Sequence, residues 1–160
     1  MAMSDKQEKA RQAAALALKY EFDYGCCPQC VLAAVQETVG LVTDETIKAS
    51  HGLSGGGGLS GVGLCGSLVG GILALGAKRG RDRDKFARGK FIGNFSRADE
   101  LSKAFKEQFG GLTCQDLQQQ FTGRTYDMWK PEEYQAFSDN RGDQCARTAE
   151  FVTRWVVERL

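Results

Sequence analysis

A glycine-rich stretch in the middle of the chain limits its fold more than any other feature. Residues 52–63 have the sequence GLSGGGGLSGVG, and no regular element is expected to survive so many conformationally free residues. The following run, residues 64–77 (LCGSLVGGILALGA), is apolar on every side, which predicts a helix buried in the centre of the domain. Although residues 52–77 carry no formal charge, the clearly apolar part is too short to cross a bilayer. We therefore expect a loop that leads into a buried central helix, and no membrane span.

Helical spacing of apolar residues recurs along the rest of the chain. Residues 4–22 place Ala13, Leu16, Ala17 and Tyr20 on one side, which predicts an amphipathic N-terminal helix within residues 1–23. The helix breaks at Gly25, and Pro28 suits the first turn of the next one. Further helices are expected over residues 43–49, 96–110, 113–121, from 131, and over 143–160. No alternating strand pattern appears, so the prediction is an all-α, compact helical bundle with residues 1–160 as one domain.

Composition excludes several classes of function. The chain has 160 residues, of which 42% are hydrophobic, and its net charge is +1. This balance argues against disorder and against a general attraction to nucleic acid or to anionic membranes, although it leaves a local basic patch open. Residues 78–85 (KRGRDRDK) form a charge run, which is typical of a solvated turn. Trp129, Trp155 and the nine Phe are expected in the core.

The redox environment follows from the start of the chain. Residues 1–11 (MAMSDKQEKAR) lack the apolar stretch of a secretory signal, so we expect a cytoplasmic protein. In a reducing compartment the six cysteines are more typical of metal ligands or redox groups than of structural disulfides. The sequence shows no catalytic acid pair and no hydrolase motif, so it gives no support for a hydrolytic enzyme and leaves open whether the protein is an enzyme.

Four cysteines lie at or near predicted helix starts: Cys27, Cys65, Cys114 and Cys145. This position is expected to lower the pKa of a thiol. Two thiolates about 4 Å apart repel by roughly 4 kcal/mol at an effective dielectric constant of 20, and a helix end offsets only about 0.3–1 kcal/mol. If the four helix starts meet, the site must therefore be protonated, oxidised or neutralised by a metal. By count alone, four cysteines suit zinc and an iron–sulfur cluster equally well.

A second pattern is the close pair in Cys27-Pro-Gln-Cys30, which has the form of a thioredoxin-like dithiol. No strand is predicted before it, so a thioredoxin fold is not expected, but such a pair can exchange with disulfides on another scaffold. The adjacent Cys26 could act as a resolving thiol. The sole histidine, His51, is expected near a helix C-terminus and not as a ligand.

The glycines have two interpretations. In the functional one, the backbone N–H groups of residues 55–63 approach a cluster or an anion and hydrogen-bond to it. In the structural one, Gly66 and Gly70 lie four residues apart on one helix face and permit close helix packing. The sequence leaves both open.

Taken together, these segments resemble the C-GCAxxG-C-C family of redox-active proteins. The similarity is carried by residues 27–32 (CPQCVL), 65–70 (CGSLVG), 105–110 (FKEQFG), 114–117 (CQDL) and Cys145, and it extends from Gly25 to the C-terminus. The resemblance implies a compact helical domain with signature cysteines at 27, 65, 114 and 145. A similar domain occurs in split-Soret cytochromes, which are dimers and associate these cysteines with an iron–sulfur centre. Ser67 replaces the usual alanine, and Cys26 and Cys30 are additional.

The resemblance favours a cytoplasmic redox protein that holds an iron–sulfur cluster on Cys27, Cys65, Cys114 and Cys145 and exchanges electrons with a partner protein. Gly63 and Gly66 would lie against the cluster, and a homodimer is an expectation to test. Haem attachment is not implied, because the chain has no Cys-x-x-Cys-His motif. Two alternatives stay open. One is a thiol–disulfide oxidoreductase that uses Cys27 and Cys30 or pairs of signature cysteines, and the other is a zinc-bound or metal-free interaction module.

Overall fold

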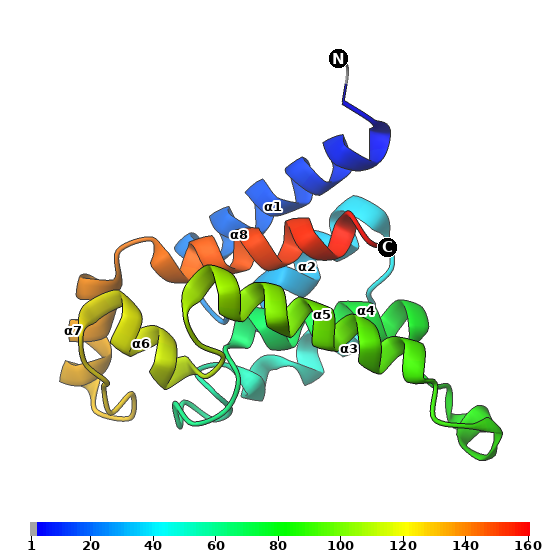
Figure 1. The fold of residues 1–160 in the computed structure, drawn as a ribbon. Coiled ribbons are helices and arrows are strands. Elements are labelled where there is room, and N and C mark those ends of the chain that lie inside the picture. Colours follow the sequence, from blue (N-terminus) through cyan, green and yellow to red (C-terminus); the bar gives the residue numbers. More distant parts are fainter. Residues whose placement is uncertain (1–2) are drawn as a thin grey trace.

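The structure is a computed structural model that describes residues 3–160, and over this range it contains helices and no strand (Figure 1). The all-α prediction is therefore confirmed. The α-helices are α1 (Asp5–Tyr24), α2 (Cys27–Val39), α3 (Asp44–Ala49), α4 (Gly66–Arg79), α5 (Ile92–Phe109), α6 (Cys114–Thr122), α7 (Pro131–Arg141) and α8 (Gln144–Val157), and the short 3₁₀ segments are η1 (His51–Leu53) and η2 (Arg83–Arg88).

Local capping explains where several of these helices begin. The Ser4 hydroxyl accepts the N–H of Gln7, whose side chain in turn accepts the N–H of Ser4, so the first turn of α1 is closed by a reciprocal pair. Thr113 and Asp116 form the same arrangement at the start of α6. Pro28 lies in the first turn of α2, where its missing N–H costs nothing.

The core forms where α1, α2, α4 and α8 pack together. Small residues on α1, among them Ala10, Ala13 and Ala17, are fully buried and let α8 approach closely (Figure 1). The helix α4 contacts α2, α5 and α8, which makes it the central helix that the apolar run predicted. A smaller cluster is formed by Phe137 of α7 with Tyr126 and Met128 from the segment before that helix.

A close contact between α2 and α4 depends on Gly70. A Cβ atom at this position would lie 2.9 Å from the carbonyl oxygen of Pro28 and 3.0 Å from its Cα. Because these are backbone atoms, the space cannot be opened by a change of rotamer. The contact holds the start of α2 beside the start of α4, and the structural interpretation of Gly70 thus accounts for its position.

The structure contradicts two predictions made from the sequence. Helix α5 begins at Ile92 and not at Ser96, because Phe91 enters it in a left-handed conformation without any side-chain cap to mark the boundary. Trp129 and several phenylalanines, among them Phe22, Phe86 and Phe95, are exposed and not in the core, whereas Trp155 is buried. The charge run over residues 78–85 is solvated as expected, but its last three residues begin the short segment η2.

Among residues 3–160, no helix has the length and apolarity needed to cross a membrane.

Replacing Gly70 by alanine should lower the free energy of unfolding by about 1–3 kcal/mol, since the added methyl group meets the α2 backbone. Gly76 is the matched control on the same helix, because a Cβ atom there meets nothing within 4 Å. Gly76→Ala should raise stability by about 0.5–1 kcal/mol through helix propensity. Urea unfolding followed by circular dichroism measures both changes. Equal effects of the two substitutions would contradict the close packing of α2 and α4.

Candidate functional site: a cysteine-lined cavity

The signature cysteines from four helix starts line one cavity of about 90 Å³. Cys27 and Cys114 are the first residues of α2 and α6, Cys65 is the cap residue of α4, and Cys145 is the second residue of α8. The prediction that each lies at or near a helix start is confirmed. The structure brings all of them to the same cavity, which is lined by residues of the main core and of the small cluster around Phe137.

A short antiparallel bridge between Leu64 and Thr113 places Cys65 next to Cys114. The N–H of Cys65 donates to the carbonyl of Leu112 at 2.8 Å, and the N–H of Cys114 donates to the carbonyl of Gly63 at 3.0 Å. These bonds occupy backbone groups that would otherwise be unpaired at two helix N-termini. The end of the glycine-rich loop and the start of α6 are therefore hydrogen-bonded to each other, which fixes the positions of Cys65 and Cys114.

Packing and side-chain hydrogen bonds fix the other two cysteines. Cys27 lies against α4, where a Cβ atom on Gly66 would come within 3.3 Å of its Sγ. Thr148, one turn along α8, donates its hydroxyl to the carbonyl of Cys145 at 2.7 Å and accepts the hydroxyl of Ser67 at 2.8 Å. The sulfur of Cys65 lies 4.0 Å from the same Thr148 oxygen. Helices α4 and α8 are thus joined by polar contacts at the cavity wall.

Burial raises the pKa of every signature thiol, so the expected lowering at helix starts is wrong. The pKa rises to about 11 at Cys114 and to about 12 at Cys145, where burial outweighs the nearby guanidinium of Arg141. At Cys65 the backbone N–H groups of Ser67 and Leu68 do lower the pKa, but burial raises it more. The physical reason is that a helix end supplies only about 0.3–1 kcal/mol, which is less than the cost of removing a thiolate from water.

At Cys27 the rise in pKa has a further cause. Burial is the largest contribution, and the negative charges of Glu21 and of the other three signature cysteines add to it. The four thiols therefore act as one electrostatic unit. Without a compensating positive charge they stay protonated at neutral pH.

A buried ion pair, which the sequence analysis missed, also lines the cavity. Glu21 of α1 is 2% exposed and pairs with Arg141, the last residue of α7, at 3.3 Å. Glu21 Oε2 and Arg141 Nε are both buried without a hydrogen-bond partner. Burial raises the pKa of Glu21, and the charge of Arg141 opposes that rise. A carboxylate on the buried face of α1, four residues after Ala17, is the one signal in the sequence that could have identified Glu21.

The additional cysteines lie differently from each other. Cys26 lines the cavity and caps α2 in a left-handed conformation, with φ 62°. The thiol of Cys30 donates to the carbonyl of Gly25 at 2.9 Å and borders a separate hollow with Tyr20 and Tyr24. Burial raises the pKa of Cys30 as well. All six cysteines are free thiols.

The two glycines that were predicted to lie against a cluster, Gly63 and Gly66, also differ in position. Gly66 lines the cavity beside Cys27, whereas the N–H of Gly63 donates to the carbonyl of Gly56 at 3.0 Å and is already used within the loop. His51 begins η1, just after the end of α3.

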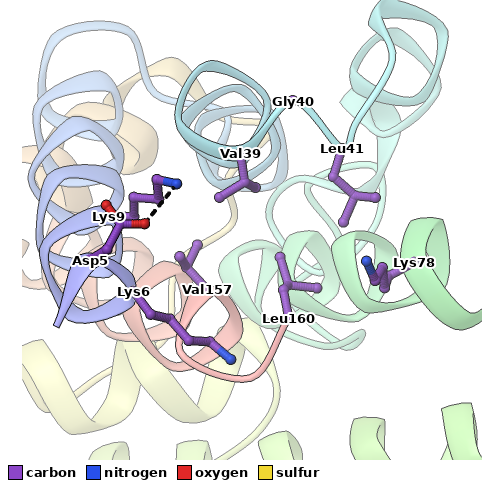
Figure 2. Close-up of a pocket in the computed structure, with 9 residues that line it drawn as sticks. All are labelled: Asp5, Lys6, Lys9, Val39, Gly40, Leu41, Lys78, Val157 and Leu160. Atoms are coloured by element: carbon purple, nitrogen blue, oxygen red, sulfur yellow. Dashed lines mark ion pairs between the residues drawn. The ribbon is translucent and has the colours of Figure 1, made fainter.

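A larger hollow of about 350 Å³ lies elsewhere, among residues of α1, α2, α4 and α8, and no cysteine lines it (Figure 2). Its rim carries an exposed ion pair between Lys9 and Asp5 at 3.0 Å. Its lining lacks the sulfur chemistry of the smaller cavity, so we assign the candidate site to the cysteines.

The donor set of the cavity is cysteine sulfur, the soft ligand that both zinc sites and iron–sulfur clusters use. In the part of the chain that the structure describes, no three His, Cys, Asp or Glu side chains are arranged to hold one metal ion. Four cysteine thiols that line one cavity, with the guanidinium of Arg141 beside them, provide soft ligands and a compensating positive charge.

Comparison with known proteins identifies the family of the chain. The chain matches the family model described as "Putative redox-active protein (C_GCAxxG_C_C)" over residues 25–159. No curated protein and no solved structure matches the chain. The matched range includes the four signature cysteines and Arg141 but begins after Glu21. Since it extends over far more than half of the 160 residues, the chain belongs to the C_GCAxxG_C_C family of redox-active proteins.

Proposed function

We propose that this chain is an electron-transfer protein that holds an iron–sulfur cluster on Cys27, Cys65, Cys114 and Cys145. The observation that carries the proposal is the convergence of these four cysteines, from four helix starts, on one cavity. A protein partner would supply and remove the electron.

Charge supports this function. Because the pKa values of all four thiols are raised, the thiols stay protonated at neutral pH unless a positively charged group binds among them. A cluster of iron and sulfide neutralises such thiolates and, when bound, accepts and releases single electrons. Arg141 would offset the negative charge that remains, and the backbone N–H groups at the start of α4 would hydrogen-bond to sulfur.

The apolar wall supports the same function. Leu117, Phe121, Met128 and Phe137 line the cavity between α6 and α7. Their side chains would exclude water from the sulfurs and so influence the reduction potential. The thiol–disulfide alternative has less support, because burial raises the pKa of both Cys27 and Cys30, and a low thiol pKa is what such exchange needs.

Anaerobic reconstitution with iron and sulfide should give the wild-type protein visible absorption and bound iron. Cys65→Ser should abolish both, because it removes a ligand. Cys30→Ser is the matched control and should keep them, since the Cys30 thiol bonds to Gly25 outside the cavity. Iron and sulfide analysis, with circular dichroism to verify folding, measures the result. A colourless wild-type protein, or equal loss in both variants, would contradict the cluster.

In the metal-free protein, the thiols of Cys114 and Cys145 should react slowly with iodoacetamide at neutral pH. Their raised pKa values keep them protonated, so the rate should grow about tenfold for each pH unit up to about pH 10. Mass spectrometry of each peptide gives the rates, and urea-unfolded protein gives the reference. A fast-reacting signature cysteine at pH 7 would instead favour a thiol–disulfide oxidoreductase.

Arg141→Gln should lower the free energy of unfolding of the metal-free protein by about 3 kcal/mol or more, because it leaves the Glu21 carboxylate buried without its partner. The double variant Glu21→Gln/Arg141→Gln should be closer to wild type, since neither charge remains. In the reconstituted protein, Arg141→Gln should also lower the reduction potential, because loss of a nearby positive charge disfavours an added electron. Urea unfolding and a redox titration measure the two effects. An unchanged stability in the single variant would show that the pair is not a buried charge unit.

A further inference from the structure

The connection between α4 and α5 has a charge balance unlike the rest of the chain. Residues 78–97, which we name the basic projection, contain eight Lys and Arg and two Asp, a net charge of +6. Because the whole chain has a net charge of +1, the remaining residues together carry −5. The near-neutral total therefore conceals a strongly basic segment. Its cations are Lys78, Arg79, Arg81, Arg83, Lys85, Arg88, Lys90 and Arg97.

The basic projection extends away from the helical body. Figure 1 shows the end of α4, η2 and the start of α5 reaching outward on the side opposite α7. Helix α4, with 14 residues, separates it from the cysteines by about 20 Å. A surface that binds the projection would consequently leave the cavity uncovered.

Three large apolar side chains are exposed on the projection. Phe86 is 52% exposed, Ile92 is 65% exposed and Phe95 is 60% exposed. Ile92 and Phe95 are three residues apart in the first turn of α5, so they share one face of that helix. Apolar side chains concentrated in this way, among charged neighbours, mark a contact surface.

Several cations of the projection are available to a ligand. Lys85 pairs with Asp82 and Arg97 pairs with Glu100. Arg88 and Lys90 are exposed and take part in no ion pair between residues 3 and 160. Their charge is therefore not neutralised by the protein itself.

We infer that the basic projection binds the surface of a lipid bilayer that contains anionic phospholipid. The cations would contact the negatively charged headgroups, while Phe86, Ile92 and Phe95 enter the boundary between headgroups and acyl chains. Both contributions are needed, since basic residues attract a protein to such a surface and apolar side chains hold it there. The inference is independent of the proposed electron transfer.

The same residues suit a nucleic acid less well. Non-specific binding of single strands uses aromatic faces on which bases stack. The guanidinium groups of Arg81 and Arg83 lie 4.7 Å and 5.0 Å from the ring centre of Phe86 and compete with a base for its face, although the side chain is 52% exposed, and Ile92 has no aromatic face. Among the three exposed apolar side chains, this leaves Phe95 alone as a free stacking surface. A lipid interface places no such demand on ring orientation.

Co-sedimentation of the full chain with vesicles tests the inference. Vesicles of phosphatidylcholine with phosphatidylglycerol should bind the protein at low salt, and vesicles of phosphatidylcholine alone should bind it at least about tenfold more weakly. High salt should weaken binding to the anionic vesicles, because it screens the charges.

Paired variants separate a local surface from net charge. Arg88→Gln/Lys90→Gln should weaken binding about twenty-five-fold, which is about fivefold for each cation. Lys6→Gln/Lys48→Gln removes the same charge from exposed positions elsewhere and should change binding by less than about twofold. Ile92→Ser/Phe95→Ser keeps every charge and should weaken binding about tenfold or more. Circular dichroism verifies that each variant is folded.

The inference would be overturned if the protein did not bind the anionic vesicles or bound both vesicle types equally. Equal effects of Arg88→Gln/Lys90→Gln and Lys6→Gln/Lys48→Gln would also overturn it. So would tighter binding to a single-stranded oligonucleotide than to the vesicles. Loss of the cluster has no bearing on it, since vesicle binding is measured on metal-free and reconstituted protein alike. Failure of either proposal is thus distinguishable from failure of the other.

Discussion

The desolvation of four thiols around one cavity is the constraint on which the rest of this structure depends. Two thiolates about 4 Å apart repel by roughly 4 kcal/mol at an effective dielectric constant of 20, and burial adds a further cost to each charge. The helix ends around the cavity return only a fraction of that. The raised pKa values of the four cysteines express the same balance. Convergence of the sulfurs is therefore tolerable only when they are neutral or share a positive group, and the packing of the bundle is what enforces the convergence.

Backbone contacts, more than the cysteine side chains themselves, bring the four cysteines to one cavity. Gly70 lets α2 approach α4, and the bridge between Leu64 and Thr113 joins the glycine-rich loop to the start of α6. In both places the side chain is small or the bond is between main-chain atoms, so the geometry does not depend on a rotamer. The proposed electron transfer would benefit from such rigidity, because ligands that do not move need little reorganisation when the charge changes.

Periodicity and capping residues were enough to predict the helical class, the central helix and the placement of the cysteines at helix starts, because all of these are local properties. The ion pair between Glu21 and Arg141 could not be predicted in the same way. Its partners are separated by 120 residues and meet only through tertiary packing. The start of α5 was misplaced because Phe91 enters the helix without a capping side chain. Trp129 was expected in the core because it is large and apolar, yet its indole N–H donates to the carbonyl of Gly58 while most of the ring stays in water.

Charge is distributed along the chain in a way that the total of +1 conceals. Screening at physiological ionic strength limits electrostatic attraction to about 8 Å, so a charged surface responds to the groups close to it and not to the sum over a protein. A charged surface close to the basic projection would therefore respond to its net charge of +6, and not to the −5 that the remaining residues carry. Because α4 places about 20 Å between the projection and the cysteines, attachment through one end would leave the chemistry at the other end under the control of its own local charges, Glu21 and Arg141 among them.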